Sequence, residues 1–127
     1  MCNLKNLSIL SVNKNNLNIS IIIIGYNSQG PLQVLLKSLS LIRDKNQILE
    51  VIYVDDGSTD QSLSFFKNYK LDYVKKHYQF RNNKGRVFAR QKGVDLAKGK
   101  WLLFLNSNVI VDINIIANYK RAVDLKL

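Results

Sequence analysis

The sequence predicts an α/β fold in which a mostly parallel sheet is flanked by helices. Four apolar runs of strand length alternate with stretches whose apolar residues recur at helical spacing. The first run, residues 19–24, is apolar on both faces, as in a central strand of a parallel sheet. Alternation of this kind is typical of right-handed βαβ units, in which successive strands lie parallel.

The first strand and helix are expected between residues 19 and 42. The β-branched run Ile19–Ile24 forms the strand and Gly25 ends it. Pro31 then opens a helix, because proline suits the first helical turn. The apolar stripe of this helix falls at i, i+3, i+4, i+7 and i+10 and comprises Leu32, Leu35, Leu36, Leu39 and Ile42.

A second and a third strand are expected at Glu50–Val54 and Leu71–Val74. The helix between them begins after Ser58 and Asp60, whose side chains are favoured helix caps. Its apolar side consists of Leu63, Phe66 and Tyr69.

A polar loop around residues 82–85 leads into a helix that Gly99 stops, and Lys100–Leu105 forms the fourth strand. The buried face of this helix comprises Ala89, Gly93, Leu96 and Ala97. After the strand, Asp112 is expected to cap a last helix. That helix turns inward Ile115, Ile116, Tyr119, Ala122 and Val123.

Length and composition indicate one globular domain, with 127 residues, 46% hydrophobic and 22% charged. We expect residues 1–18 to form a loosely ordered polar leader. The single cysteine, Cys2, leaves no disulfide framework and favours a reducing compartment. No apolar run approaches the ~20 residues of a membrane helix, so we expect a cytoplasmic protein.

The net charge of +10 indicates a polyanionic partner, such as nucleic acid, an anionic lipid surface or a phosphate-bearing small molecule. In the stretch 75–86, basic residues alternate with Tyr78 and Phe80, a composition that can track a single nucleic-acid strand. Alternatively, scattered lysines only keep the domain soluble.

Three polar clusters follow the carboxyl ends of strands one, two and four: residues 26–28, 55–58 and 106–108. If these strands are neighbours, the clusters converge where such sheets bind ligands. The spacing of Gly25 and Gly30 is that of a phosphate loop, but its Gly-Lys-Ser/Thr ending is absent, as is a dinucleotide fingerprint. Of Asp55 and Asp56, one is expected to face a ligand, because neighbouring residues of a strand point to opposite sides.

Arg86 and Arg90 lie four residues apart near the amino end of the third helix. Cations there oppose the helix dipole, and an anion such as a diphosphate would turn this cost into attraction. Alternatively, Arg86 and Arg90 are surface residues that form ion pairs with acidic neighbours and bind no ligand.

The segments ISIIIIGYN, EVIYVDDGSTDQS and NNKGRVFARQKGVDLAKGKWLLFLNSN resemble the amino-terminal half of family 2 glycosyltransferases over residues 19 to about 124. These are inverting enzymes with a Rossmann-like GT-A fold that use nucleotide sugars. The resemblance implies a UDP- or GDP-linked donor and cell-envelope polysaccharide biosynthesis, at the inner face of the membrane. Residues 19–127 would be a truncated donor-binding domain that lacks the acceptor half and its general base, so no catalytic residue is assigned.

The resemblance also implies roles for single residues. Tyr26 would lie against the base and Asp56 would accept a hydrogen bond from its imide nitrogen, with Asp55 close by. Gly85 and Arg90 belong to the resembling segment N-x-G-x-x-x-A-R, in which Arg90 would face the nucleotide.

The family's fourth strand usually ends in Asp-x-Asp, which binds the nucleotide sugar and a divalent metal. Here the position is Asn106-Ser107-Asn108. Asn106 can still hydrogen-bond a ribose or sugar, but Asn108 lacks the charge that Mg²⁺ and Mn²⁺ favour, so metal binding should be weakened or lost. Arg86, Arg90 and Lys84 would then neutralise part of the diphosphate charge.

Two further hypotheses assign the chain to other functional classes than a glycosyltransferase. A non-catalytic remnant or accessory module would bind nucleotide weakly or not at all, and would self-associate or pack on a partner subunit through exposed apolar surface. Nucleic-acid binding is the third, and the resemblance already accounts for part of the basic stretch.

Overall fold

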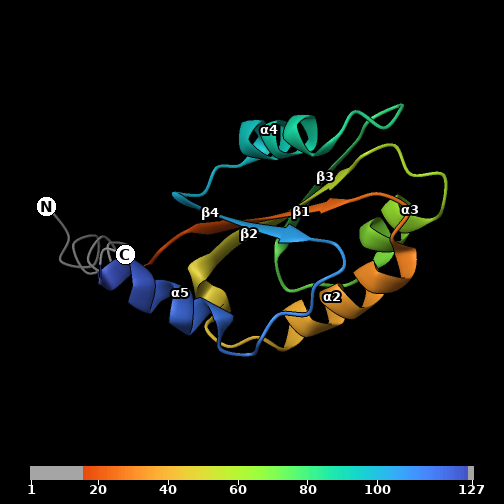
Figure 1. The fold of residues 1–127 in the computed structure, drawn as a ribbon. Coiled ribbons are helices and arrows are strands. Elements are labelled where there is room, and N and C mark those ends of the chain that lie inside the picture. The colour runs from red at the N-terminus through yellow and green to blue at the C-terminus, as the bar shows by residue number, and fades with distance from the viewer. Residues whose placement is uncertain (1–15, 126–127) are drawn as a thin grey trace, which may run out of the picture.

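The structure, a computed structural model, describes residues 16–125 and contains a parallel sheet with the strand order β3-β2-β1-β4. The strands are β1 (Ile19–Gly25), β2 (Ile48–Asp55), β3 (Val74–Gln79) and β4 (Trp101–Asn106). The helices are α2 (Gln29–Leu41), the 3-10 helix η1 (Lys45–Gln47), α3 (Ser62–Asn68), α4 (Arg86–Leu96) and α5 (Ile115–Asp124). Helix α4 covers one face, while α2, α3 and α5 lie on the other (Figure 1). The expected α/β fold is confirmed.

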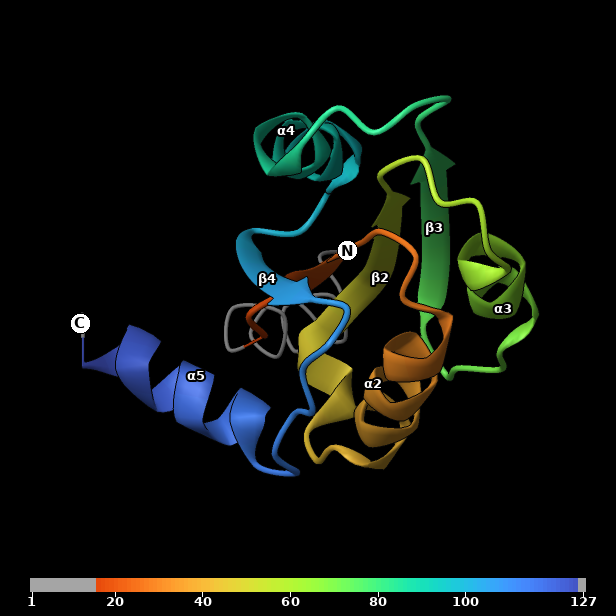
Figure 2. The same cartoon turned by 45° about the vertical axis from the view of Figure 1, so that its right-hand side comes forward.

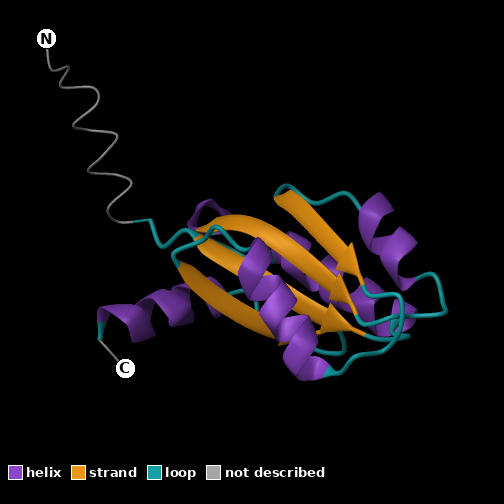
Figure 3. Cartoon of the chain, turned by 90° about the horizontal axis from the view of Figure 1, so that it is seen from above, coloured by secondary structure: helices purple, strands orange, loops and turns teal. Residues whose placement is uncertain are grey.

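Strand β1 is central and buried along its whole length, because it pairs with β2 on one side and β4 on the other. Ile19, Ile21 and Ile23 pack in the core shared with α2, α3 and α5. Ile22 and Ile24 pack in a second core beneath α4. Helices on both faces therefore explain why β1 is apolar on both faces. The four strand arrows point to the same edge of the sheet (Figure 3).

The leucine stripe of α2 is buried as expected, with Leu32, Leu35, Leu36 and Leu39 fully covered. The helix begins at Gln29, two residues before Pro31, and Ile42 lies just beyond its end yet remains buried. Of the expected leader, residues 1–15 lie outside the described part of the chain. Leu17 is buried, and its N–H donates to Gln47 Oε1 at 2.8 Å.

The third strand, β3, spans Val74–Gln79, so the expected position at Leu71–Val74 is wrong. The two ranges share only Val74. β3 is an edge strand and largely exposed, so its sequence is charged rather than apolar. Lys75 Nζ donates to the carbonyls of Phe66, Lys67 and Tyr69 at the end of α3, at 2.5–3.0 Å. Internal contacts thus engage part of the basic stretch for which nucleic-acid binding was one of the alternatives.

A buried carboxylate joins the amino ends of the strands. Glu50 accepts hydrogen bonds from Lys76 Nζ, Ser20 Oγ and the Lys98 N–H, each at 2.6 Å. Lys76 Nζ also donates to the Leu96 carbonyl at 3.0 Å, at the end of α4. Burial raises the pKa of Glu50, but these hydrogen bonds outweigh it and hold the pKa below its usual 4.5.

Helix α5 lies beside the β4 end of the sheet (Figure 2). Its N-cap residue is Asn114, so the expected capping by Asp112 is wrong. Asp112 instead closes the preceding turn, since its Oδ1 accepts from the Asn114 N–H at 2.7 Å. Ile116 is fully buried, as expected. None of the helices between residues 16 and 125 has the length and apolarity needed to cross a bilayer.

Candidate functional site

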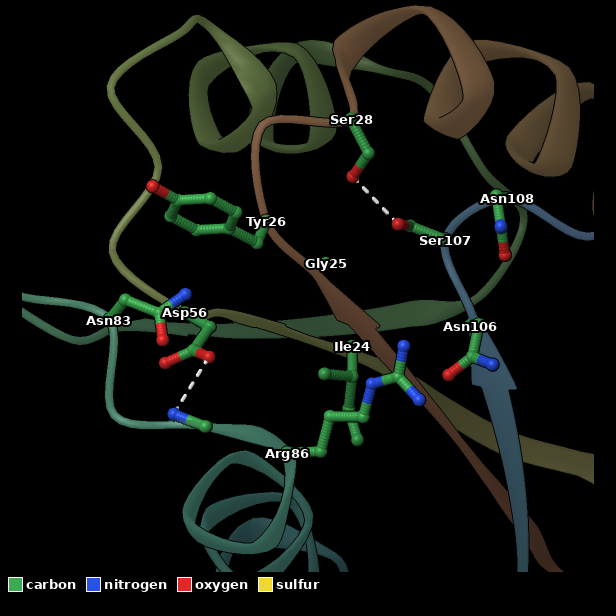
Figure 4. Close-up of a pocket in the computed structure, with 11 residues that line it drawn as sticks. Ile24, Gly25, Tyr26, Ser28, Asp56, Asn83, Arg86, Asn106, Ser107 and Asn108 are labelled. Carbon is green, nitrogen blue, oxygen red and sulfur yellow. Dashed lines mark hydrogen bonds between the residues drawn. The ribbon is translucent and has the colours of Figure 1, made fainter.

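A cavity of about 450 Å³ lies at the carboxyl edge of the sheet (Figure 4). Its lining comprises Ile24, Gly25, Tyr26, Ser28, Asp56, Asn83, Gly85, Arg86, Asn106, Ser107 and Asn108. All three polar clusters contribute to it, because β1 lies between β2 and β4. The predicted convergence of the three loops is confirmed, and the start of α4 adds a fourth wall.

The wall beneath the first loop consists of packed hydroxyl groups. Ser107 Oγ and Ser28 Oγ are buried and lie 2.6 Å apart, so they join the loop after β4 to the loop after β1. Gly25 permits this approach: a Cβ there would lie 2.8 Å from both Ser28 Oγ and Tyr53 Oη. Ser28 and Ser107 were not among the predicted site residues, although both belong to the polar clusters.

The loop after β2 is tied to the loop after β1. Asn27 has a φ of +47°, and its Oδ1 accepts from the Thr59 N–H at 2.7 Å. The Asn27 N–H donates to Ser58 Oγ at 2.8 Å, so Ser58 fixes the first loop. The expectation that Ser58 caps α3 is wrong, because the N-cap residue of that helix is Gln61.

Asp60 does satisfy helix N-termini. Its oxygens accept from the N–H of Ser62 at 2.9 Å and from that of Gln29 at 3.2 Å, the first residues of α3 and α2. Burial raises the pKa of Asp60, but the hydrogen bonds from Ser62 and Gln29 lower it below its usual 3.8. The N-cap residue of α3 is Gln61, so Asp60 is not the N-cap residue that we expected, although its carboxylate satisfies the first N–H of α3.

The two adjacent aspartates differ in environment. Asp55 is fully buried and lies outside the cavity lining. It accepts from Tyr53 Oη at 2.9 Å and from the Ser58 N–H at 2.6 Å. Burial, followed by the Asp55 charge, raises the pKa of Tyr53, which therefore remains a hydrogen-bond donor. Asp55 thus shapes the loop from below.

Asp56 lines the cavity and holds the loop that precedes α4. One carboxylate oxygen accepts from the Lys84 N–H at 2.8 Å and the other from the Gly85 N–H at 3.0 Å. Gly85 has a φ of +100°, a conformation suited to glycine, and Arg86 starts the helix directly after it. Asp56 therefore fixes the backbone from which Arg86 projects.

The arginine side chains of α4 are placed differently. The Arg86 guanidinium extends into the cavity and lies between Ile24 and Asn106 (Figure 4). Within residues 16–125 the ion pairs are Lys45–Asp72 and Lys76–Glu50, so Arg86 has no carboxylate partner in this part of the chain. Arg90 lies outside the cavity lining.

The predicted residues separate into two ends of the cavity. Tyr26, which is 48% exposed, lies with Asp56 and Asn83 at one end. Arg86 and Asn106 lie at the other, with Asn108 above them (Figure 4). An aromatic ring and a carboxylate suit a heterocyclic base, whereas a guanidinium with two amides suits an anionic or hydroxylated group.

Comparison with known proteins agrees with this arrangement. The sequence model of the family described as Glycosyl transferase family 2 matches residues 20–117. The chain is 32% identical over 90 residues to the uncharacterized glycosyltransferase YibD of Escherichia coli (strain K12). That match covers 71% of this chain and 26% of YibD, so the chain spans about a quarter of that relative.

Solved structures agree with the fold. Staphylococcus aureus TarS 1-349 in complex with UDP-GlcNAc superimposes with a TM-score of 0.76 and 29% identity, over 85% of this chain and 31% of TarS. The mannosyltransferase PcManGT from Pyrobaculum calidifontis, in complex with GDP-Man and Mn²⁺, superimposes with a TM-score of 0.78 and 18% identity. The match covers 86% of this chain and 33% of PcManGT, and at this identity it shows a likeness of fold alone. The chain belongs to glycosyl transferase family 2, and its fold is of the GT-A type.

Proposed function

We propose that the chain binds a UDP- or GDP-linked sugar and presents it for inverting glycosyl transfer. The observation that carries this proposal is the division of a single cavity into an end with Tyr26 and Asp56 and an end with Arg86 and Asn106. The likeness to TarS, which was solved with UDP-GlcNAc, supports a nucleotide sugar as the ligand.

In this proposal each lining residue has a distinct role. Tyr26 stacks on the base, Asp56 accepts a hydrogen bond from the imide nitrogen, and Asn106 contacts the ribose or the sugar. Gly85 lets the backbone approach the ligand closely. Asp55 acts indirectly by holding the loop after β2. Arg90 is exposed and adds positive charge beside the cavity.

The acceptor and the general base are proposed to lie outside residues 16–125. Inverting transfer needs a base that deprotonates the acceptor hydroxyl. Asp56 is the only carboxylate among the described residues that line the cavity, and backbone N–H groups engage both of its oxygens. A cell-envelope polysaccharide as acceptor and attachment to the inner face of the membrane are proposals of the same kind. The net charge of +10 supports only the second, because it favours an anionic lipid surface.

A divalent metal fits this cavity poorly. Mg²⁺ and Mn²⁺ favour carboxylate oxygens, whereas the loop after β4 offers two amides and a serine whose Oγ is engaged by Ser28. Across residues 16–125, no three His, Cys, Asp or Glu side chains form a cluster suited to a metal ion. We propose that metal affinity is weak, and no step of the transfer is assigned to a metal.

Titration calorimetry with UDP and GDP tests the proposed function. We expect saturable binding of at least one nucleotide, and we expect Tyr26→Ala to weaken it about tenfold, since base stacking contributes ~1–3 kcal/mol. Tyr26 is exposed and its hydroxyl forms no hydrogen bond within the described chain, so this variant should keep the stability of the parent.

Tyr78→Ala is the matched control, because Tyr78 is also partly exposed but lies outside the cavity lining. It should leave nucleotide affinity unchanged. If neither UDP nor GDP binds the parent chain, the proposed function is wrong.

The second candidate function is an accessory module without nucleotide binding. It is favoured by exposed apolar side chains on α4 and the β4 edge, including Val87, Phe88 and Phe104. Surface of this kind favours self-association or a partner subunit. Size-exclusion chromatography across a range of protein concentrations tests it, and a constant monomer contradicts self-association.

A further inference from the structure

We propose that Arg86 supplies the positive charge that a divalent metal would otherwise provide, so that the cavity binds the diphosphate of its ligand without metal. This inference rests on the proposed function and specifies how the same site holds an anion. The poor metal donors described above leave a diphosphate without a cation unless a side chain supplies one.

Arg86 is the only cationic side chain among the described residues that line the cavity. The neighbouring Lys84 Nζ is directed at the Phe80 ring, 5.4 Å from its centroid, and Arg90 lies outside the lining. Asp56 contributes the only negative charge in that lining. A bound diphosphate would therefore depend on Arg86 for charge compensation.

The chemistry of Arg86 suits this role. A guanidinium presents five N–H donors in a plane and binds two phosphate oxygens at once. Within residues 16–125 no hydrogen bond or ion pair engages the Arg86 side chain, so its donors are available to a ligand. The guanidinium lies between Ile24 and Asn106 and faces the loop after β4, the position at which metal ligands would be needed (Figure 4).

The backbone beneath Arg86 is held in place. The N–H groups of Lys84 and Gly85, the two residues before it, donate to Asp56, and the Ala89 N–H donates to the Gly85 carbonyl at 3.2 Å. The α4 backbone is thus anchored on the protein side and leaves the guanidinium in the cavity. Anchoring of this kind lowers the entropic cost of binding an anion.

Calorimetric titration of the full chain with UDP, GDP and inorganic pyrophosphate tests the inference, each in EDTA and in Mn²⁺. We expect the parent chain to bind equally well in both conditions. Arg86→Ala should lower the affinity at least about tenfold in EDTA, since a hydrogen bond to a charged group contributes ~1.5–3 kcal/mol. Arg43→Ala removes an exposed guanidinium outside the cavity and should change nothing.

The converse variant carries Asn106→Asp and Asn108→Asp together. It introduces two carboxylates beside Arg86, so nucleotide binding should become stronger in Mn²⁺ than in EDTA. Combining it with Arg86→Ala should make binding depend on Mn²⁺. Such increases in affinity with Mn²⁺ would show that the amides of Asn106 and Asn108 are the reason that the parent chain binds its ligand without metal.

The outcomes separate the two proposals. Tighter binding of the parent chain in Mn²⁺ than in EDTA, or unchanged affinity in Arg86→Ala, overturns this inference and leaves the proposed function intact. Pyrophosphate binding that requires Arg86, without binding of UDP or GDP, supports this inference and overturns the nucleotide proposal. Absence of binding by all three probes overturns both.

Discussion

Glu50→Ala is expected to lower the free energy of unfolding by about 3 kcal/mol or more, in the range found when one partner of a buried ion pair is removed. The Glu50 side chain is 3% exposed and accepts from Lys76, Ser20 and the Lys98 N–H. Its loss leaves the Lys76 ammonium without a counter-charge and a backbone N–H without an acceptor. Urea denaturation followed by circular dichroism measures the change.

The second ion pair of the described chain is the control. Lys45 Nζ lies 3.4 Å from Asp72 Oδ2, and the Asp72 side chain is 85% exposed. Asp72→Ala should therefore cost less than about 1 kcal/mol. Equal losses in the two variants would contradict the structural role assigned to Glu50.

The pH dependence of stability tests the same carboxylate. Hydrogen bonds hold the pKa of Glu50 below its usual 4.5 in the folded chain. The stability it contributes is therefore fully present above about 4.5 and is lost as the pH falls through the folded pKa. The stability difference between the parent chain and Glu50→Gln should narrow as the pH falls, and a constant difference would contradict the lowered pKa.

Gly57→Ala is expected to destabilise the fold by at least about 2 kcal/mol and to weaken nucleotide binding. Gly57 has a φ of +82°, where a side chain costs ~1–2 kcal/mol. A Cβ there would lie 2.6 Å from the Asn82 carbonyl carbon and from the Asn83 nitrogen. Since both neighbours are backbone atoms, the loop must shift, which costs ~1–3 kcal/mol more. Asn83 lines the cavity, so the shift alters the site.

Gly30→Ala is the matched control for this substitution. Gly30 is the second residue of α2, and a Cβ there meets nothing within 4 Å. We expect stability to stay constant or to rise by ~0.4–1 kcal/mol, because alanine restricts the unfolded chain. Thermal denaturation and UDP titration of both variants compare them. A Gly57→Ala chain as stable as Gly30→Ala would show that the loop is not packed as described.

The buried part of the fold was predictable because apolar residues occupy the positions that face the core. β1 and the stripe of α2 are examples, and both are covered on the faces that the pattern indicates. β3 was not predictable, because the partners that satisfy its lysines lie outside the strand, on β2 and at the end of α3. Lys76 pairs with Glu50, and Lys75 contacts the end of α3. A pattern of hydrophobicity contains no information about such pairing.

The site was predictable at loop level and less so for single residues. Strand ends locate Tyr26, Asp56 and Asn106, because parallel strands bring their carboxyl ends to one edge. Arg86 and Arg90 share a helix face by spacing, yet four residues advance a helix by ~6 Å. Only the first of them lines the cavity. Whether a helix residue reaches the cavity depends on where the helix meets the sheet. The spacing of residues in the sequence does not determine that position.

The carboxylates at the two ends of β2 have a consequence for motion. Asp56 holds the N–H groups that precede α4, while Glu50 binds the Lys98 N–H just beyond it, and Lys76 joins Glu50 to the Leu96 carbonyl. The helix is thus pinned at both ends to one strand and cannot swing as a lid. Its amides should exchange with solvent in step with those of β2, as one cooperative unit.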